Sequence, residues 1–240
     1  MNLVIDIGNT LRKIAVFNND ECVYCQSFSV ITRDLLTSIL NQFSIENSII
    51  SSVADVDVQV TEFLKTNTKL IHYTHQTKLP VTLLYQSVAT LGLDRIANAV
   101  GAASMFRNRN VLSIQAGTCL VFDFVNEKGA YFGGSISPGM KMRFEALHEK
   151  TKKLPLIREH EKDIHFLGMN TEESILSGVI VGMCCEIDGL INEYKAQFNA
   201  LVVLFSGGDA ALLQKSIKNT IFAAPNVVLK GLNEIIKYNV

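Results

Sequence analysis

The composition predicts a compact globular protein without a strong electrostatic bias. The chain has 240 residues, of which 48% are hydrophobic and 19% charged, and its formal net charge is −1. A chain of this length buries enough apolar surface to fold without disulfides or metals, as one large domain or two small ones. The charge balance argues against unspecific nucleic-acid binding, so we expect no nucleic-acid partner.

Three features predict a cytoplasmic location. The first residues, Met1 to Asp6, lack the basic region of a signal peptide. No uninterrupted apolar run approaches the ~20 residues that span a bilayer, so we expect no membrane partner. The five cysteines are an odd number, which favours reduced thiols over a disulfide framework.

Apolar periodicity and turn residues predict alternating strands and helices in the first half of the chain. The expected strands are 3–7, 13–17, 22–28, 49–53 and 69–73, with helices at 34–43 and 56–66. A further helix, rich in small residues, follows Asp94 and Arg95.

The second half repeats this order from residue 111 onward. The expected strands are 111–116, 119–125, 130–132 and 201–205, and the expected helices are 140–149, 172–198 and one after Gly208. Residues 133–139 are rich in glycine and predict a tight loop. Because 3–10 also resembles 112–118, we expect an α/β protein of two tandem βββαβα domains, 1–105 and 106–240.

The end of the first strand carries a candidate phosphate-binding turn. Asp6 follows buried strand residues, and Gly8 and Thr10 follow Asp6. A buried carboxylate is unfavourable without a partner, and a phosphate turn would supply one. Backbone N–H groups and the Thr10 hydroxyl would hold phosphate, Asp6 would hold Mg²⁺ directly or through water, and Lys13 would add positive charge. The alternative is an ordinary hairpin with an Asx-turn.

Two more strands end in glycine, at Gly117-Thr118 and at Gly207-Gly208. Glycine lets the backbone approach a ligand closely, and a following helix presents its N-terminus to an anion. Each break alone is equally consistent with a plain turn. Together with the first turn, the breaks predict a nucleotide held between two domains.

Asp94 and Arg95 begin the helix rich in small residues. An acid is favoured at this end by the helix dipole, whereas an arginine is not. Arg95 is therefore a candidate ligand for a substrate carboxylate, and Asp94 could accept a proton from a substrate hydroxyl. The alternative is a helix cap with a surface ion pair.

Cys22 and Cys25 have the spacing of a redox motif, but they fall on a predicted strand. Residues three apart on a regular strand face opposite sides of the sheet. We therefore expect no chemistry from this pair.

Four ordered segments together resemble the type III pantothenate kinases, a family with the fold of acetate and sugar kinases, heat-shock chaperones and actin. They are 6–13, 92–95, 133–139 with 151–155, and 170–178, and segment 225–232 also fits. No segment is specific alone, but the ordered set covers essentially the whole chain. The resemblance implies two actin-like, ribonuclease H-like domains with an interdomain cleft.

The resemblance also implies an activity, ATP-dependent phosphorylation of pantothenate to 4′-phosphopantothenate, the first step of coenzyme A biosynthesis. Asp94 would be the general base, and Arg95 would grip the substrate carboxylate. The implied pantothenate site is Tyr85, Gly92, Leu93, Asp94, Arg95 and Thr171. The implied ATP and phosphate ligands are Asp6, Ile7, Gly8, Asn9, Thr10, Leu11, Arg12, Lys13, Gly117, Thr118, Gly207 and Gly208.

The resemblance further implies a homodimer that requires Mg²⁺ and a monovalent cation, K⁺ or NH₄⁺. The first domain would carry the first phosphate loop and the pantothenate site. The second would carry the second phosphate loop, the adenosine-side loop and the dimer contacts.

One position departs from the family pattern. The family has an Asp where this chain has Gln115, at the place assigned to the monovalent cation. A neutral amide oxygen would hold that cation more weakly, or the requirement would be lost. Two other readings stay open, a kinase of another small hydroxy acid and a regulatory member of the family.

Overall fold

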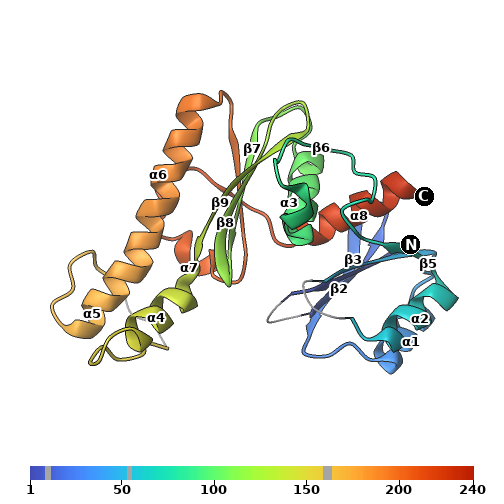
Figure 1. Cartoon of the computed structure of the whole chain (residues 1–240), viewed down its shortest axis with the longest axis horizontal. Coiled ribbons are helices and arrows are strands. Elements are labelled where there is room, and N and C mark those ends of the chain that lie inside the picture. Colours follow the sequence, from blue (N-terminus) through green and yellow to red (C-terminus); the bar gives the residue numbers. More distant parts are fainter. Residues whose placement is uncertain (9–11, 53–55, 159–163) are drawn as a thin grey trace. The chain divides into compact units, whose positions relative to one another are not determined.

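The computed structural model describes residues 1–8, 12–52, 56–158 and 164–240, which form two compact units (Figure 1). The first unit contains 1–108, 125–132 and 226–240, and the second contains 109–124 and 133–225. The division into domains 1–105 and 106–240, and the cleft between them, stay predictions. In the compact units, the C-terminal segment 226–240 groups with the first half of the chain.

A mixed five-stranded sheet forms the centre of the first unit. Its strands are β1 (Asn2–Ile7), β2 (Arg12–Asn18), β3 (Glu21–Phe28), β4 (Asn47–Ser52) and β5 (Lys69–His72). They lie in the order β3-β2-β1-β4-β5. The first three strands pair antiparallel, whereas β4 and β5 run parallel to β1. This confirms the strand order predicted along the sequence.

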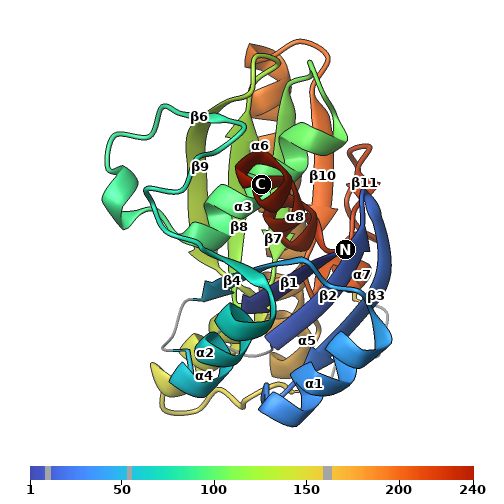
Figure 2. The same ribbon diagram turned by 90° about the vertical axis from the view of Figure 1, so that its right-hand side faces the viewer.

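Helices cover both faces of this sheet (Figures 1 and 2). They are α1 (Arg33–Gln42), α2 (Val58–Asn67), α3 (Leu93–Met105) and α8 (Val227–Asn239). Leu3 and Ile5 pack with α1 and α2, while Val4 packs with α3 and α8. Because alternate residues enter two different cores, the consecutive β1 residues Leu3, Val4 and Ile5 are all apolar.

Helices α3 and α8 approach each other backbone to backbone. A Cβ atom on Gly231 would lie 1.7 Å from the Ala97 carbonyl oxygen, and one on Gly101 would lie 2.2 Å from that of Val227. Glycine at both positions is therefore what permits this packing. The contact places the C-terminal helix beside the helix that begins with Asp94.

A β-bulge interrupts the pairing of β2 with β3. Phe17 lies opposite Cys22, but Val16 lies opposite Tyr24, so Val23 is an extra residue on β3. An extra residue shifts the alternation of side chains by one. Cys22 and Cys25 consequently share a face, and the prediction that they face opposite sides is wrong.

The second unit contains strands in the same order as the first. Its strands are β7 (Val111–Ala116), β8 (Cys119–Val125), β9 (Ala130–Pro138), β10 (Val202–Ser206) and β11 (Phe222–Ala223). The sheet order β11-β10-β7-β8-β9 mirrors the order of the first sheet, and β10 is parallel to both neighbours. Asp6 pairs with Ser51, and Gln115 pairs with Ser206 at the corresponding place. The predicted duplication of one plan is therefore confirmed.

The tip of the β8–β9 hairpin, residues 125–132, belongs to the first unit. There β6 (Thr82–Leu83) pairs with Ala130 and Tyr131, and a short 3₁₀ turn, η1 (Val88–Thr90), precedes α3. Leu91, Ile96 and Ala99 pack with Tyr131 in a separate small core.

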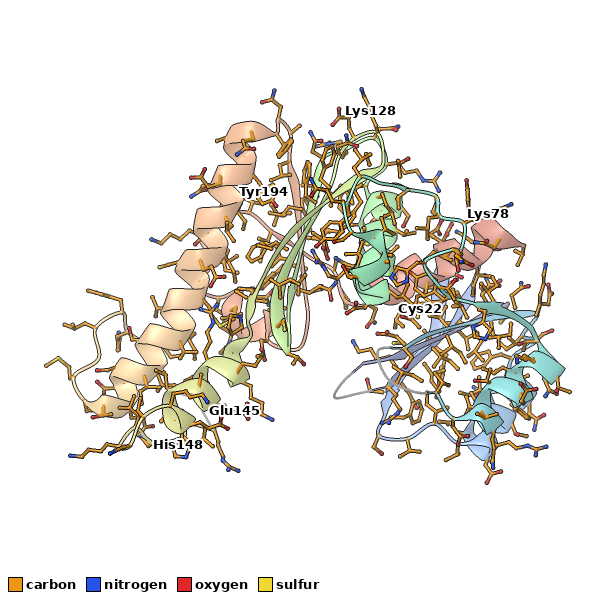
Figure 3. All side chains as sticks on the ribbon, viewed as in Figure 1. Cys22, Lys78, Lys128, Glu145, His148 and Tyr194 are labelled. Carbon is orange, nitrogen blue, oxygen red and sulfur yellow. The ribbon has the colours of Figure 1, made fainter. Side chains whose placement is uncertain are left out.

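A long helical segment packs on the second sheet. It comprises α5 (Thr171–Leu176), a π-helical turn (Ser177–Val181) and α6 (Gly182–Gln197). Figure 3 shows Tyr194 pointing from α6 toward the sheet, where its ring lies 5.5 Å from that of Phe124. The remaining helices of this unit are α4 (Met140–Glu149) and α7 (Ala210–Leu213).

This segment, Thr171–Gln197, is long and apolar enough to cross a membrane by length and composition, although acidic residues interrupt its apolar run. Its most apolar 18 residues have a mean hydropathy of 1.7, and 44% of them are buried. The buried side chains, including Met183, Ile187 and Ile191, belong to the core of the second unit. A helix that fills a protein core passes the same test.

One local prediction is wrong. Residues 133–138 continue strand β9 instead of forming a loop. A Cβ on Gly134 would lie 1.9 Å from the Phe122 carbonyl oxygen, so this glycine serves close strand pairing. The helix expected after Gly208 is present as α7, which is four residues long.

Candidate functional site

Asp6 points to the face of the first sheet that α3 covers. It alternates in step with Val4, and its strand neighbours are Lys13 on β2 and Ser51 on β4. The pKa of Asp6 is raised to about 6: burial raises it most, the negative charge of Asp94 adds to the rise, and Lys13 opposes both. The structure thus brings together three predicted residues, Asp6, Lys13 and Asp94.

The start of α3 fixes the Asp94 carboxylate. Gly92 caps the helix without a side-chain bond, and Asp94 Oδ1 accepts the Arg95 backbone N–H at 2.9 Å. A Cβ on Gly92 would lie 2.4 Å from the same Asp94 oxygen. Any side chain at residue 92 would therefore displace the carboxylate, which explains why a glycine suits this position.

Tyr73 is a site residue that the sequence prediction missed. Its hydroxyl donates to the Leu93 carbonyl oxygen at 2.9 Å, and His75 Nε2 lies 2.8 Å from the Leu91 carbonyl oxygen. Burial, with the charges of Asp94 and Asp6, raises the pKa of Tyr73. The available signal was its place at the end of a predicted strand, because parallel strands gather their carboxyl ends at one edge.

Arg95 lies beneath an aromatic cover in the first unit. Its side chain is buried, and its guanidinium carbon is 6.0 Å from the centre of the Tyr85 ring. Tyr85 in turn lies 6.2 Å from the ring of Tyr131. Contact with a ring face stabilises a guanidinium while leaving its N–H donors in plane for an anion. The predicted residues Tyr85, Leu93, Asp94 and Arg95 therefore form one neighbourhood.

The second unit assembles its glycine-rich turns from β7 and β10. Gly207 has φ of +104°, and a Cβ there would lie 2.1 Å from the Ala116 carbonyl oxygen, which also accepts the Asp209 N–H at 3.1 Å. The turn after β10 therefore packs directly on the turn after β7. Gly117 and Gly208 have open space at the Cβ position. The protein backbone at these two glycines can therefore approach a ligand such as a phosphate group closely.

The turn after β7 is also held by a neighbouring loop. Gly139 donates its N–H to the Thr118 carbonyl oxygen at 3.2 Å, and a Cβ at 139 would lie 2.1 Å from the Gly117 carbonyl oxygen. The Thr118 side chain stays exposed. These contacts fix the shape of the predicted second phosphate loop, including Gly117 and Thr118.

Gln115 and Thr171 are also in the second unit. Gln115 is half-buried at the end of β7, at the position equivalent to Asp6. Thr171 begins α5, where Asn170 caps the helix by accepting the Glu173 N–H at 2.9 Å. Thr171 lines a mainly apolar cavity of about 870 Å³ together with Leu147, Leu154 and Ile175.

Part of the predicted first phosphate loop lies outside the described residues. Asn9, Thr10 and Leu11 lie outside the described residues. Ile7 and Gly8 are the last described residues before this gap. After the gap, the Arg12 guanidinium donates a hydrogen bond to the Ser29 carbonyl oxygen. Within the described ranges, no three His, Cys, Asp or Glu side chains cluster as a metal site. A metal here would complete its coordination with phosphate oxygens and water, as Mg²⁺ commonly does.

Comparison with known proteins identifies the family. The sequence model described as "Type III pantothenate kinase" matches residues 2–193. A type III pantothenate kinase from Christiangramia forsetii is 41% identical over 243 residues, covering 100% of this chain and 99% of that protein.

Solved structures agree at the level of the fold. A protein from Campylobacter jejuni described as a Baf family transcriptional activator superposes with a TM-score of 0.57 at 20% identity, covering 99% of this chain and 98% of that one. A glucokinase from an Antarctic psychrotroph gives a TM-score of 0.52 at 12% identity, with 99% and 98% covered. The chain has the two-domain actin-like fold and belongs to the type III pantothenate kinase family.

Proposed function

We propose that this enzyme transfers the γ-phosphoryl group of ATP to the primary hydroxyl of pantothenate and so forms 4′-phosphopantothenate. The observation that carries the proposal is the juxtaposition of Asp6, Asp94 and Lys13 in the first unit, next to a buried arginine at residue 95. Phosphoryl transfer depends on positioning and charge neutralisation more than on covalent chemistry. This set supplies both.

Asp94 acts as the general base in this proposal. The backbone N–H of Arg95 and the absence of a side chain at Gly92 hold its carboxylate at the start of α3. From there it receives the proton of the substrate hydroxyl as the phosphoryl group arrives. Arg95 binds the pantothenate carboxylate, and this anchor orients the hydroxyl toward Asp94. Tyr85 supports the guanidinium from its ring face.

The environment of Asp6 fits a divalent cation. The negative charge of Asp94 disfavours ionisation of Asp6, and among the described residues Lys13 counters this effect. A cation at Asp6 would neutralise this charge and let the carboxylate stay ionised. We propose that Asp6 holds Mg²⁺, directly or through water. When bound, Mg²⁺ neutralises the charge that develops on the phosphate oxygens.

The second unit contributes the remaining phosphate contacts in this proposal. Gly117, Gly208 and the exposed Thr118 hydroxyl bind ATP, with backbone N–H groups directed at the phosphates. Gln115 replaces a charged ligand by a neutral one, so we propose a weak monovalent-cation site or none. Thr171 contributes to the pantothenate pocket.

We further propose that the enzyme is a homodimer. The apolar cavity beside α4 and α5 and the exposed Phe166, Leu167 and Met169 all lie on the second unit. An apolar surface of this kind is typical of an interface between proteins. Light scattering of the purified enzyme tests it, and a monomer at micromolar concentration would contradict the proposal.

The direct test of the function is ADP release with Mg²⁺-ATP, in the presence and absence of pantothenate, in K⁺ or Na⁺ buffer. Pantothenate-dependent turnover is the expected result. Calorimetric titration of pantothenate accompanies the assay. Binding of pantothenate without turnover would support a regulatory member of the family. The absence of both binding and turnover would point to another hydroxy acid as substrate.

A further inference from the structure

Cys22 and Cys25 are brought together by the bulge in β3. The two cysteines lie opposite Phe17 and Ala15, which are two residues apart on β2. Residues two apart on a strand have Cα atoms about 6.7 Å apart, so the Cα atoms of the two cysteines opposite them should be separated by a similar distance. This spacing falls at the upper end of the ~4.4–6.8 Å between Cα atoms that disulfides bridge. Without the bulge, the same residues would be farther apart and on opposite faces.

The surroundings of the two thiols agree with their shared face. Cys25 contributes to the raised pKa of Cys22, so the two side chains are close enough to interact. Cys22 Sγ also donates to the Tyr24 carbonyl oxygen at 3.3 Å, and Asn226 Nδ2 donates to Cys25 Sγ at 3.5 Å. Figure 3 shows Cys22 beside α8, whose Lys230 interacts with the Cys22 sulfur electrostatically.

Both thiols are accessible to a small reagent. Cys22 and Cys25 are exposed, in contrast to the buried Cys184. They lie on β3, the edge strand of its sheet, whose outer side has no neighbouring strand in the five-stranded sheet. An edge strand can adjust its backbone at small cost when a bond forms, because only one ladder of hydrogen bonds restrains it.

We propose that Cys22 and Cys25 form a reversible redox site that closes to an intramolecular disulfide. Partial burial and the neighbouring Cys25 raise the pKa of Cys22, so the reduced form gains no stability from a stabilised thiolate. A dithiol without such stabilisation favours its disulfide, whereas a stabilised thiolate makes the disulfide oxidising. The site is separate from the residues that we assign to phosphoryl transfer.

The oxidant in this proposal is a low-molecular-weight disulfide, with oxidised glutathione as the probe. One cysteine thiolate attacks it, forms a mixed disulfide and releases one glutathione thiolate. The second cysteine then attacks the protein sulfur of the mixed disulfide and releases the second glutathione. The protein loses two electrons and two protons, and one glutathione disulfide becomes two thiols.

The experiment follows the tryptic peptide 14–33, which contains both cysteines and none of the other three. The native enzyme is equilibrated with defined ratios of oxidised to reduced glutathione, and the free thiols are then alkylated and the peptide weighed. We expect a peptide that is two hydrogens lighter and unalkylated under oxidising conditions. Excess reduced glutathione should restore two alkylated cysteines.

Two variants serve as controls. Cys25→Ser should give only a mixed disulfide with glutathione at Cys22. The double change Cys25→Ser with Gln26→Cys moves the second thiol by one residue to the other face of β3 and should also give mixed disulfides only. Circular dichroism verifies that each variant is folded. A wild-type peptide that stays dithiol or carries glutathione at every redox ratio would overturn the proposal, as would an internal disulfide in the displaced variant.

Discussion

At the scale of single residues, Asp94 is the group on which the proposed reaction depends. Asp94→Asn keeps the size of the side chain but removes its ability to accept a proton. We expect kcat to fall by about 10²–10⁴-fold, while calorimetric binding of pantothenate is retained. An unchanged kcat would remove Asp94 from the role of base, and circular dichroism controls for the fold.

Arg95 is predicted to determine affinity for the substrate carboxylate. Arg95→Ala removes a charged hydrogen-bond partner, a loss of about 1.5–3 kcal/mol, so we expect the KM for pantothenate to rise roughly 10–100-fold. Arg95→Lys should recover only part of this loss, because an ammonium group lacks the planar fork of the guanidinium. Steady-state kinetics with both substrates tests this, and a defect confined to the KM for ATP would contradict it.

The ionised carboxylate of Asp6 should lower the free energy of unfolding at neutral pH, whereas its protonated form is favoured in the fold. Its pKa is raised from 3.8 to about 6, so the folded protein holds this proton more tightly than the unfolded chain does. The resulting stabilisation is complete below about pH 4 and is lost as the pH rises through about 6.

Asp6→Asn removes this dependence. We expect the variant to be more stable than wild type at pH 8, by about 1–3 kcal/mol, with the difference shrinking at pH 5. Urea unfolding at the two pH values, without Mg²⁺, measures it. Equal differences at both pH values would show that burial of the charge is not the cause. The variant should have lost kinase activity, because its amide cannot replace the proposed metal ligand.

At the scale of elements, the segment after β5 holds the start of α3 in place. The Tyr73 hydroxyl bonds to the Leu93 carbonyl oxygen, one residue before Asp94. Tyr73→Phe removes this bond, whose net value is about 1 kcal/mol, so we expect kcat to fall roughly fivefold with an unchanged KM for ATP. The matched control is Tyr238→Phe on the exposed part of α8, which should leave kcat unchanged. A rise in the KM for ATP equal to the fall in kcat would indicate general damage to the site.

The contact between α3 and α8 is predicted to tolerate no side chain at Gly231. The nearest atoms belong to the backbone of Ala97, which cannot rotate away. Gly231→Ala should therefore destabilise the protein by about 1–3 kcal/mol. Gly189→Ala, on an exposed turn of α6 with open space around it, should stabilise by up to ~1 kcal/mol. Equilibrium unfolding of both variants checks the pair, and a neutral Gly231→Ala would show that the helices separate easily.

At the scale of the whole molecule, the two sheets share one strand order but differ in charge at one equivalent position. Near the end of its strand, β1 of the first sheet carries Asp6, and β7 of the second sheet carries Gln115 at the equivalent position. Gln115→Asp restores a carboxylate, so we expect thermal stability to increase with K⁺ in the variant and to respond little in wild type. Differential scanning fluorimetry in K⁺ against Li⁺ measures this without catalysis. Equal responses in both proteins would refute the role of residue 115.

The sequence by itself determined the main strands of both sheets, the repeated plan and the family, but not the short strands β6 and β11 or the continuation of β9. These follow from local signals, because apolar alternation and glycine breaks are properties of consecutive residues. The pairing of Asp94 with Arg95 at a helix start was also visible, since both residues are adjacent in the chain. Thr118 and Gly207 were identified as turn residues for the same reason.

Only the tertiary structure decided which distant residues meet. Asp6 and Asp94 come together because β1 alternates between two cores and α3 covers the face that Asp6 shares with Val4. Tyr73 joins them from the segment that follows β5. The bulge at Val23 depends on pairing with β2, which no local pattern encodes, and it reverses the expectation for Cys22 and Cys25. Register and packing are relations between segments, so they are fixed only when the chain folds.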